Sequence, residues 1–264
     1  MTQLIRPVAG EYKDATRRQR GFTLIELSIV LTIIGLIVGG ILKGQELINN
    51  ARIKTQVAQI DSIKSAVLTF QDRYGYLPGD FNNASSLGFT TSGSIDGDGN
   101  GYIAASGSTS ASAAAAPTTE SIMAWPELSA TNLLGGYYVP ANETLAGIAN
   151  AEANAYMPGK ITGSRLWLAT FTDTQYPKIG TLAIRLQKEI STTVVPATGL
   201  TAPDMYGLDA KYDDGLPLSG SISVVGSLTG ATSGCISADS ATGTYLSAAS
   251  NSTSAACVPL FAVQ

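Results

Sequence analysis

The stretch Arg17-Arg18-Gln19-Arg20-Gly21-Phe22-Thr23-Leu24-Ile25-Glu26 joins a basic cluster and a glycine to a long apolar run. Within residues 22–42 the only ionisable side chain is that of Glu26. About 20 apolar residues are enough for a helix that spans a bilayer. A carboxylate at the centre of such a helix costs about 2.5–3.5 kcal/mol on insertion scales, so Glu26 calls for a partner.

Two common kinds of N-terminal segment explain this pattern less well. A secretory signal peptide has an apolar region of about 7–15 residues that ends in small residues. Here the apolar run is longer, and residues 39–43 contain no such cleavage site. An ordinary single-span anchor accounts for the length and for a basic cluster on the cytoplasmic side. It accounts neither for Glu26 nor for the string Gly-Phe-Thr-Leu-Ile-Glu at residues 21–26.

The same residues resemble the class III signal of the type IV pilin and type II secretion pseudopilin family. The resemblance implies that a membrane peptidase cleaves after Gly21, removes residues 1–21 as a leader peptide, and methylates the new N-terminus at Phe22. It implies that the apolar helix forms the assembly core, where Glu26 pairs with the amino group of Phe22 on a neighbouring subunit. Two opposite charges in an apolar bundle offset each other's desolvation only when they are in register.

Composition narrows the remaining functions. The leader holds five basic and two acidic residues, so the formal net charge of −4 for the whole chain becomes −7 for the mature chain. An acidic mature chain argues against binding of nucleic acid through its phosphates. The chain has no histidine, which removes the commonest general base and metal ligand. We therefore predict no zinc chemistry and no catalytic residue; the adjacent carboxylates Asp213 and Asp214 are poorly placed to flank a substrate bond.

The helical pattern continues beyond the apolar run. Apolar residues recur at spacings of three and four, as on one face of a helix; they are Ile53, Val57, Ile60, Ile63, Val67, Phe70 and Tyr74. The pattern predicts one helix over residues 22–74, with residues 22–42 in the membrane or the assembly core. Gly75 is a suitable cap residue, and the following Leu-Pro-Gly-Asp cannot continue the helix. Gly35, Gly39 and Gly40 permit close approach of another helix.

Residues 75–264 are predicted to form a globular α+β head. Residues 80–119 suggest a loop region, and a short helix is expected over residues 120–134, with Pro126 inside it and glycines at its end. Strands are expected over residues 165–172, 180–186, 190–195 and 221–228, and another helix over residues 202–212. A long helix followed by an antiparallel sheet gives an α+β fold, and the resemblance implies the same pilin-like architecture.

Cys235 and Cys257 are the only cysteines. In an oxidising compartment such a pair is most simply a disulfide, and closing a loop of about 22 residues contributes roughly 3 kcal/mol. Two buried thiols are the alternative. The resemblance favours the disulfide, because many members of the family close a C-terminal loop in this way.

A candidate calcium loop lies in the head. Residues 96–103 match the first half of a calcium-binding loop, with Asp96, Asp98, Asn100 and Tyr102 at the ligand positions. Ile103 follows where an apolar residue would fix the loop to the core. The twelfth position is a glycine, so a bound ion needs a carboxylate from elsewhere; the candidates are Glu120, Asp209, Asp213 and Asp214. A flexible Gly-Asp turn is the alternative. Calcium is the only cofactor that the sequence suggests.

The resemblance implies a structural subunit of a type IV pilus or pseudopilus. A low-copy minor pilin, a tip adhesin or another membrane-anchored binding protein is the alternative, and copy number distinguishes them. The implied partners are further copies of the chain, a prepilin peptidase, an assembly ATPase, a platform protein and a secretin. The implied location is the bacterial inner membrane for the single-pass precursor, with the head in the periplasm, and a surface pilus or periplasmic pseudopilus after assembly.

Overall fold

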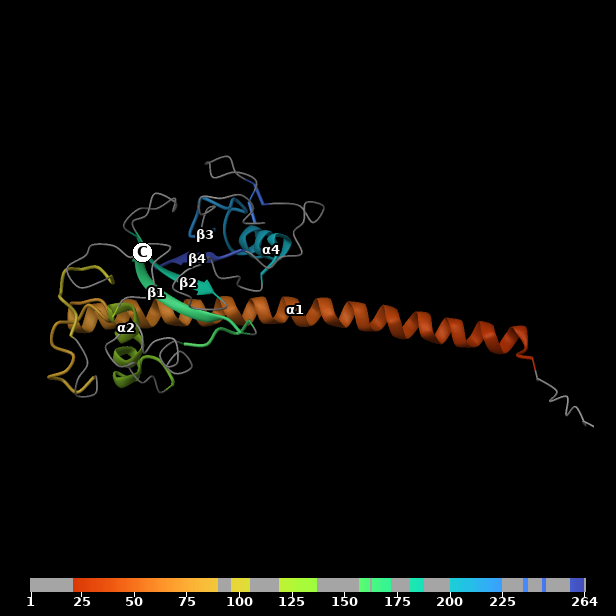
Figure 1. The fold of residues 1–264 in the computed structure, drawn as a ribbon, viewed down its shortest axis with the longest axis horizontal. Helices are drawn as coiled ribbons and strands as arrows, with labels where there is room; N and C mark the ends of the chain where they lie inside the picture. Colours follow the sequence, from red (N-terminus) through yellow and green to blue (C-terminus); the bar gives the residue numbers. More distant parts are fainter. Residues whose placement is uncertain are drawn as a thin grey trace, which may run out of the picture. The chain divides into compact units, whose positions relative to one another are not determined.

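The computed structural model describes residues 21–89, 96–104, 119–136, 157–161, 163–171, 181–187, 200–224, 235–236, 244–245 and 257–263. The chain divides into two compact units, Met1–Asn49 and Asn50–Gln264. Helix α1 (Leu24–Tyr74) begins in the first unit and ends in the second. The fold is α+β and pilin-like, with a long N-terminal helix and a small antiparallel sheet, as predicted (Figure 1).

Helix α1 has 51 residues and contains no proline, so its backbone ladder is uninterrupted. It ends where the sequence predicts. Gly75 adopts a left-handed φ of +78°, which a residue without a Cβ adopts at little cost. Its backbone N donates to the Gln71 carbonyl at 2.8 Å. This hydrogen bond and the left-handed glycine together form a helix cap, which confirms the predicted role of Gly75.

The predicted apolar stripe of α1 is buried in the second unit. Six of its seven residues lie in the core and Tyr74 packs at its edge. Two glutamines also lie on the buried face, which the periodicity did not indicate. Gln59 Nε2 donates to the Pro158 carbonyl at 2.9 Å, and Gln56 Oε1 accepts from the Lys160 amide at 2.6 Å. These two polar side chains can be buried because they form hydrogen bonds with backbone groups of residues 158 and 160.

The sheet contains four described strands in the order β1-β2-β4-β3, and every neighbouring pair is antiparallel. The strands are β1 (Arg165–Phe171), β2 (Thr181–Gln187), β3 (Ile222–Val224) and β4 (Pro259–Ala262). One face joins α1 in the main core, to which Ile63, Leu168, Ile184 and Phe261 all belong. The other face carries a smaller cluster that includes Trp167 and Phe171. Alternation along the strands therefore supplies apolar side chains to both faces.

Two shorter helices complete the described head. Helix α2 (Thr119–Ala130) continues through Pro126 and ends four residues before the predicted boundary. Asn132 takes a left-handed φ of 58° there, and asparagine tolerates this cap conformation better than most residues. Helix α4 (Ala202–Tyr212) matches its predicted bounds. Thr201 and Asp204 form a capping box at its start, which explains why this helix could be read from the sequence.

The strand predictions were partly confirmed. Strands β1 and β2 lie within one residue of the predicted bounds, and β3 is described from residue 222 to residue 224. The strand predicted over residues 190–195 lies outside the described residues. Strand β4 was missed, because four residues that begin with proline give a weak strand signal.

The predicted disulfide is present: Cys235 bonds to Cys257, which lies two residues before the start of β4.

Candidate functional site

The residues at the predicted cleavage point precede the helix and are accessible. Gly21, Phe22 and Thr23 have no regular secondary structure. The Phe22 side chain is 88% exposed, and a Cβ atom on Gly21 would meet no other atom within 4 Å. Exposed, irregular chain is the kind of segment that proteases cut most readily.

Thr23 and Glu26 form a capping box at the start of α1. The backbone N and the hydroxyl of Thr23 both donate to Glu26 Oε2 at 2.8 Å. The backbone N of Glu26 donates to Thr23 Oγ1 at 3.2 Å. The box satisfies backbone groups that a helix start leaves unpaired, and it places a carboxylate at the positive end of the helix dipole. Thr23 was not predicted as part of this site, although the T-x-x-E pattern before an apolar run indicates such a box.

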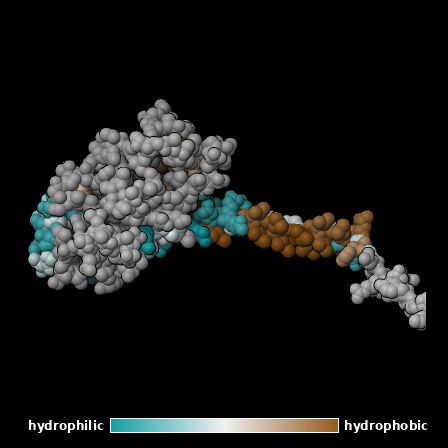
Figure 2. Space-filling model, in the orientation of Figure 1, coloured by the Kyte–Doolittle hydropathy of each residue, from teal (hydrophilic) through white to brown (hydrophobic). Residues whose placement is uncertain are grey.

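The first part of α1 exposes apolar side chains on all sides. No residue between 22 and 42 is buried, and Leu24 and Leu36 are 87% and 78% exposed. Figure 2 shows this part as a continuous hydrophobic surface. Among the described residues, α1 is the one helix long and apolar enough to cross a membrane. A helix that is hydrophobic all round is normally buried in a bilayer or among other helices.

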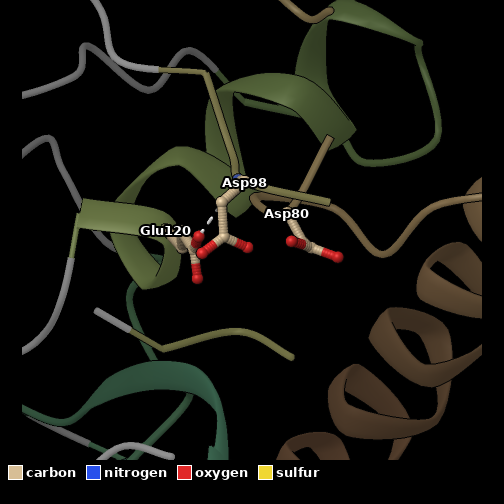
Figure 3. A group of neighbouring side chains, drawn as sticks. All are labelled: Asp80, Asp98 and Glu120. Atoms are coloured by element: carbon tan, nitrogen blue, oxygen red, sulfur yellow. Dashed lines mark hydrogen bonds between the residues drawn. The ribbon is translucent and has the colours of Figure 1, made fainter. Parts of the chain in front are cut away.

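A group of three carboxylates lies in the head (Figure 3). Asp80 comes from the turn after α1, Asp98 from the loop at residues 96–104, and Glu120 from the first turn of α2. One carboxylate oxygen of each lies within 4.8 Å of the others. Asp80 and Glu120 are buried and Asp98 is exposed, so the group opens toward solvent on one side.

Two glycines allow these three segments to meet. A Cβ atom on Gly79 would lie 2.1 Å from the Glu120 carbonyl oxygen, and Gly79 has a left-handed φ of +91°. A Cβ atom on Gly97 would lie 2.2 Å from the backbone carbon of Asp80. Any other residue at either position would force the backbones apart. Pro78-Gly79-Asp80 and Gly97-Asp98 are therefore more than flexible turns, because they set the spacing of the carboxylates.

The carboxylates of Asp80 and Glu120 accept hydrogen bonds from backbone amides of the loop at residues 96–104. Asp80 accepts from the Asn100 amide at 3.0 Å and from the Gly101 amide at 2.8 Å. Glu120 accepts from the Ala104 amide at 2.7 Å. Ile103 is fully buried, and its amide donates to the Thr170 hydroxyl on β1 at 3.0 Å. The loop is thus fixed at both ends, and Ile103 has the anchoring position that the sequence predicts.

Residues 16–42 match the family profile described as the prokaryotic N-terminal methylation motif. The chain carries the class III signal of type IV pilins and pseudopilins. This finding confirms the resemblance drawn from residues 17–26. No curated protein and no solved structure matches the chain.

Burial alters the acidity of the carboxylates in the pilin-type head. Burial raises the pKa of Glu120 to about 7, and Asp98 and Asp80 add to the rise, while the Ala104 amide opposes it. The pKa of Asp80 is also raised by burial, against the amides that it accepts from. Burial raises the pKa of Glu127, about two turns further along α2, to about 8. This cluster therefore retains protons near neutral pH that a bound cation would displace.

Of the four predicted calcium ligands in the loop, Asp98 lies in the group of three carboxylates. Glu120, which was one of the candidates for a carboxylate from outside the loop, lies in the same group. Asp96 instead accepts from the Ser85 amide and hydroxyl, both at 2.7 Å. Asn100 Nδ2 donates to Asp98 at 3.0 Å, and the Tyr102 amide donates to Asn100 Oδ1 at 2.8 Å.

Sequence reasoning did not find Asp80 or Glu127. Asp80 follows a Pro-Gly turn that was interpreted only as the end of the helix. Glu127 accepts from the Gly79 amide at 2.7 Å, and its Oε1 has no hydrogen-bond partner among the described residues. The other three candidates, Asp209, Asp213 and Asp214, form a separate group. Calcium binding by this loop stays a prediction.

Proposed function

We propose that this chain is a structural subunit of a type IV pilus or of a type II secretion pseudopilus. The observation that carries the proposal is the exposed apolar surface over residues 22–42, which begins at a methylation signal. A subunit alone leaves this surface uncovered, and a bilayer or a bundle of identical helices would cover it. The proposed activity is assembly and involves no chemical turnover.

The proposed pathway starts in the inner membrane, with the basic leader on the cytoplasmic side and the head in the periplasm. Prepilin peptidase cleaves after Gly21 and methylates Phe22. An assembly ATPase and a platform protein then move the subunit from the bilayer into the filament. A secretin forms the channel in the outer membrane. Gly35, Gly39 and Gly40 lie on the exposed surface, where a Cβ would meet no other atom of the chain. They favour close approach of neighbouring helices.

Glu26 has two roles in this proposal. Within one subunit its Oε2 accepts from Thr23, which lowers the cost of keeping a carboxylate in an apolar segment. In the filament the same carboxylate pairs with the N-terminal amine of Phe22 on a neighbouring subunit. A subunit stacked out of register leaves Glu26 without the amine, so the pairing selects the correct packing.

The first experiment compares filaments sheared from cells with the membrane fraction, by N-terminal sequencing and intact mass. A chain that begins at N-methylated Phe22 in sheared filaments supports a surface pilin. The same chain confined to the inner membrane supports a pseudopilin. A chain that begins at Met1 in both fractions refutes processing. Quantification in the same samples separates a major subunit, present at high copy, from a minor or tip subunit.

We infer as a second function that the head binds calcium at Asp80, Asp98 and Glu120. Calcium takes oxygen ligands at about 2.3–2.6 Å, so two ligands of one ion lie at most about 5 Å apart. The three carboxylate oxygens lie within 4.8 Å of one another and fit this limit. Calcium there would tie the end of α1, the loop at residues 96–104 and the start of α2 together.

The test compares the melting temperature of the full chain in detergent with about 1 mM calcium and with chelator. The wild type should melt higher in calcium, and this difference should be smaller in Glu120→Gln. Asp72→Asn removes an exposed carboxylate of α1 and serves as the control. An equal calcium effect in wild type and in Glu120→Gln would remove calcium from this group.

A further inference from the structure

A second group of carboxylates lies at the C-terminal end of α4. Asp209 belongs to the last turn of this helix, Asp213 caps it, and Asp214 follows. One carboxylate oxygen of each lies within 4.8 Å of the others. The negative end of the helix dipole also lies here, so three acidic side chains at this position are electrostatically unfavourable by themselves.

The Asp209 carboxylate is buried with one oxygen unsatisfied. Asp209 is 0% exposed. Its Oδ2 accepts from the Tyr245 hydroxyl at 2.7 Å, whereas Oδ1 has no hydrogen-bond partner among the described residues. A buried carboxylate oxygen without a partner is strongly destabilising unless a proton or a cation compensates it. This oxygen is the feature that distinguishes the group from an ordinary acidic surface.

Neighbouring hydrogen bonds hold the other two carboxylates in place. Asp213 accepts from the Ile222 amide at 2.7 Å. Asp214 accepts from the Leu216 amide at 2.9 Å and from the Ser219 hydroxyl at 2.6 Å. These hydrogen bonds orient the two carboxylates. The loop after α4 thereby presents both side chains toward Asp209.

Among the described residues, Lys64 of α1 is a basic side chain that interacts with this group. It is half-buried, and burial lowers its pKa while Asp61 and Asp213 oppose that shift. Its ammonium is therefore shared between Asp61 and Asp213, whereas Oδ1 of Asp209 has no hydrogen-bond partner among the described residues.

We propose that Asp209, Asp213 and Asp214 form a second divalent-cation site, selective for calcium-like ions that prefer oxygen ligands. Oδ1 of Asp209 supplies the buried ligand, and Asp213 and Asp214 supply ligands from the loop. The ion would fix the end of α4 to β3 through Asp213 and to Tyr245 through Asp209. This site is independent of the group at Asp80, Asp98 and Glu120.

The test measures calcium bound per chain by equilibrium dialysis at about 1 mM calcium, with the full chain in detergent. Glu120→Gln is the common background, because it removes the first group from the measurement. This background should bind one calcium ion per chain. Adding Asp209→Asn, which preserves the shape of the side chain, should weaken binding by about tenfold or more. Adding Asp72→Asn should leave binding unchanged.

A further variant distinguishes loss of the calcium site from loss of calcium binding through misfolding. Asp214 is exposed, so adding Asp214→Asn should weaken calcium binding by about tenfold without altering the near-ultraviolet spectrum of the buried tryptophans. Absence of calcium from the Glu120→Gln background would overturn the second site, whatever the result at the first. Binding that survives both Asp209→Asn and Asp214→Asn would overturn it as well.

Discussion

The two parts of α1 place apolar side chains in opposite environments. In residues 24–42 they lie on every side of the helix and none is buried, whereas in residues 53–70 they form one stripe that lies in the head core. Charged residues follow the same division, since the first part holds only Glu26 and the second holds several on its outer face. A stripe suffices to dock a helix on its own domain, but a surface that is apolar all round requires other molecules. One continuous helix thus supports folding through its second part, and the proposed function assigns its first part to assembly.

The largest effect is expected from the single charge in the first part. Glu26→Ala should abolish or greatly reduce filaments while cleavage after Gly21 continues, because the pairing with the neighbouring N-terminus is lost. Glu26→Gln separates the two roles of this residue, since glutamine retains a capping box but carries no charge. Filament yield from sheared cells and the mass of the processed chain measure both outcomes.

The control for this prediction is Glu46→Gln, which removes an exposed carboxylate beyond the apolar run. It should leave filament yield near that of the wild type. Wild-type yield from Glu26→Ala would contradict the pairing. Rescue of assembly by Glu26→Gln alone would assign the role of Glu26 to the helix cap instead of the charge.

The second part of α1 should control the stability of the head. Phe70 is fully buried, and its ring centroid lies 4.7 Å from that of Tyr74 and 6.2 Å from that of Phe81. Phe70→Ala should lower the free energy of unfolding by about 3–5 kcal/mol. Leu36→Ala, at a position 78% exposed in the first part, should change it by about 0.5 kcal/mol or less. Denaturant unfolding in detergent, followed by tryptophan fluorescence, compares the two.

Tryptophan is a suitable probe because Trp125 and Trp167 are both buried in the head. Equal destabilisation by Phe70→Ala and Leu36→Ala would mean that both parts of the helix support the head. That result would refute the division between assembly and folding.

This division could be predicted from the sequence because both parts of the helix follow a local rule. An unbroken apolar run and a spacing of three and four are visible along the chain, and Gly75 marks the end. Gln56 and Gln59 were not predicted to be buried, because their partners at residues 158–161 lie about a hundred positions away. The same reason applies to Asp80, whose proximity to Glu120 depends on the close approach at Gly79 and not on any linear spacing.

The stability of the head should also depend on pH. Glu120 has a folded pKa of about 7 against an ordinary value of 4.5, so the folded state holds more protons between these values. The free energy of unfolding should therefore fall as pH rises from about 4.5 to 7 in chelator, and level off above that range. Glu120→Gln should flatten this slope, as measured by melting temperature at each pH.

The pKa values of Asp80 and Glu127 are also raised, so these carboxylates contribute slopes of their own. The informative quantity is therefore the difference between wild type and variant. Asp72→Asn, on the exposed face of α1, should retain the wild-type slope. A slope in Glu120→Gln as steep as in the wild type would assign the proton to another carboxylate.

The smallest effect is expected at Thr23, which donates to the Glu26 carboxylate within the same subunit. Thr23→Ala removes the side chain that holds Glu26 and accepts from its amide, which should cost about 1 kcal/mol of local helix stability. Amide hydrogen exchange at residues 24–27 should become faster in Thr23→Ala and stay near the wild-type rate in Thr23→Ser, because serine retains the hydroxyl. Filament yield should fall less than in Glu26→Ala, since the charge remains. A loss of filaments as complete as that of Glu26→Ala would mean that the hydrogen bonds from Thr23 are what make the carboxylate tolerable in the apolar segment, and that pairing with a neighbour depends on them.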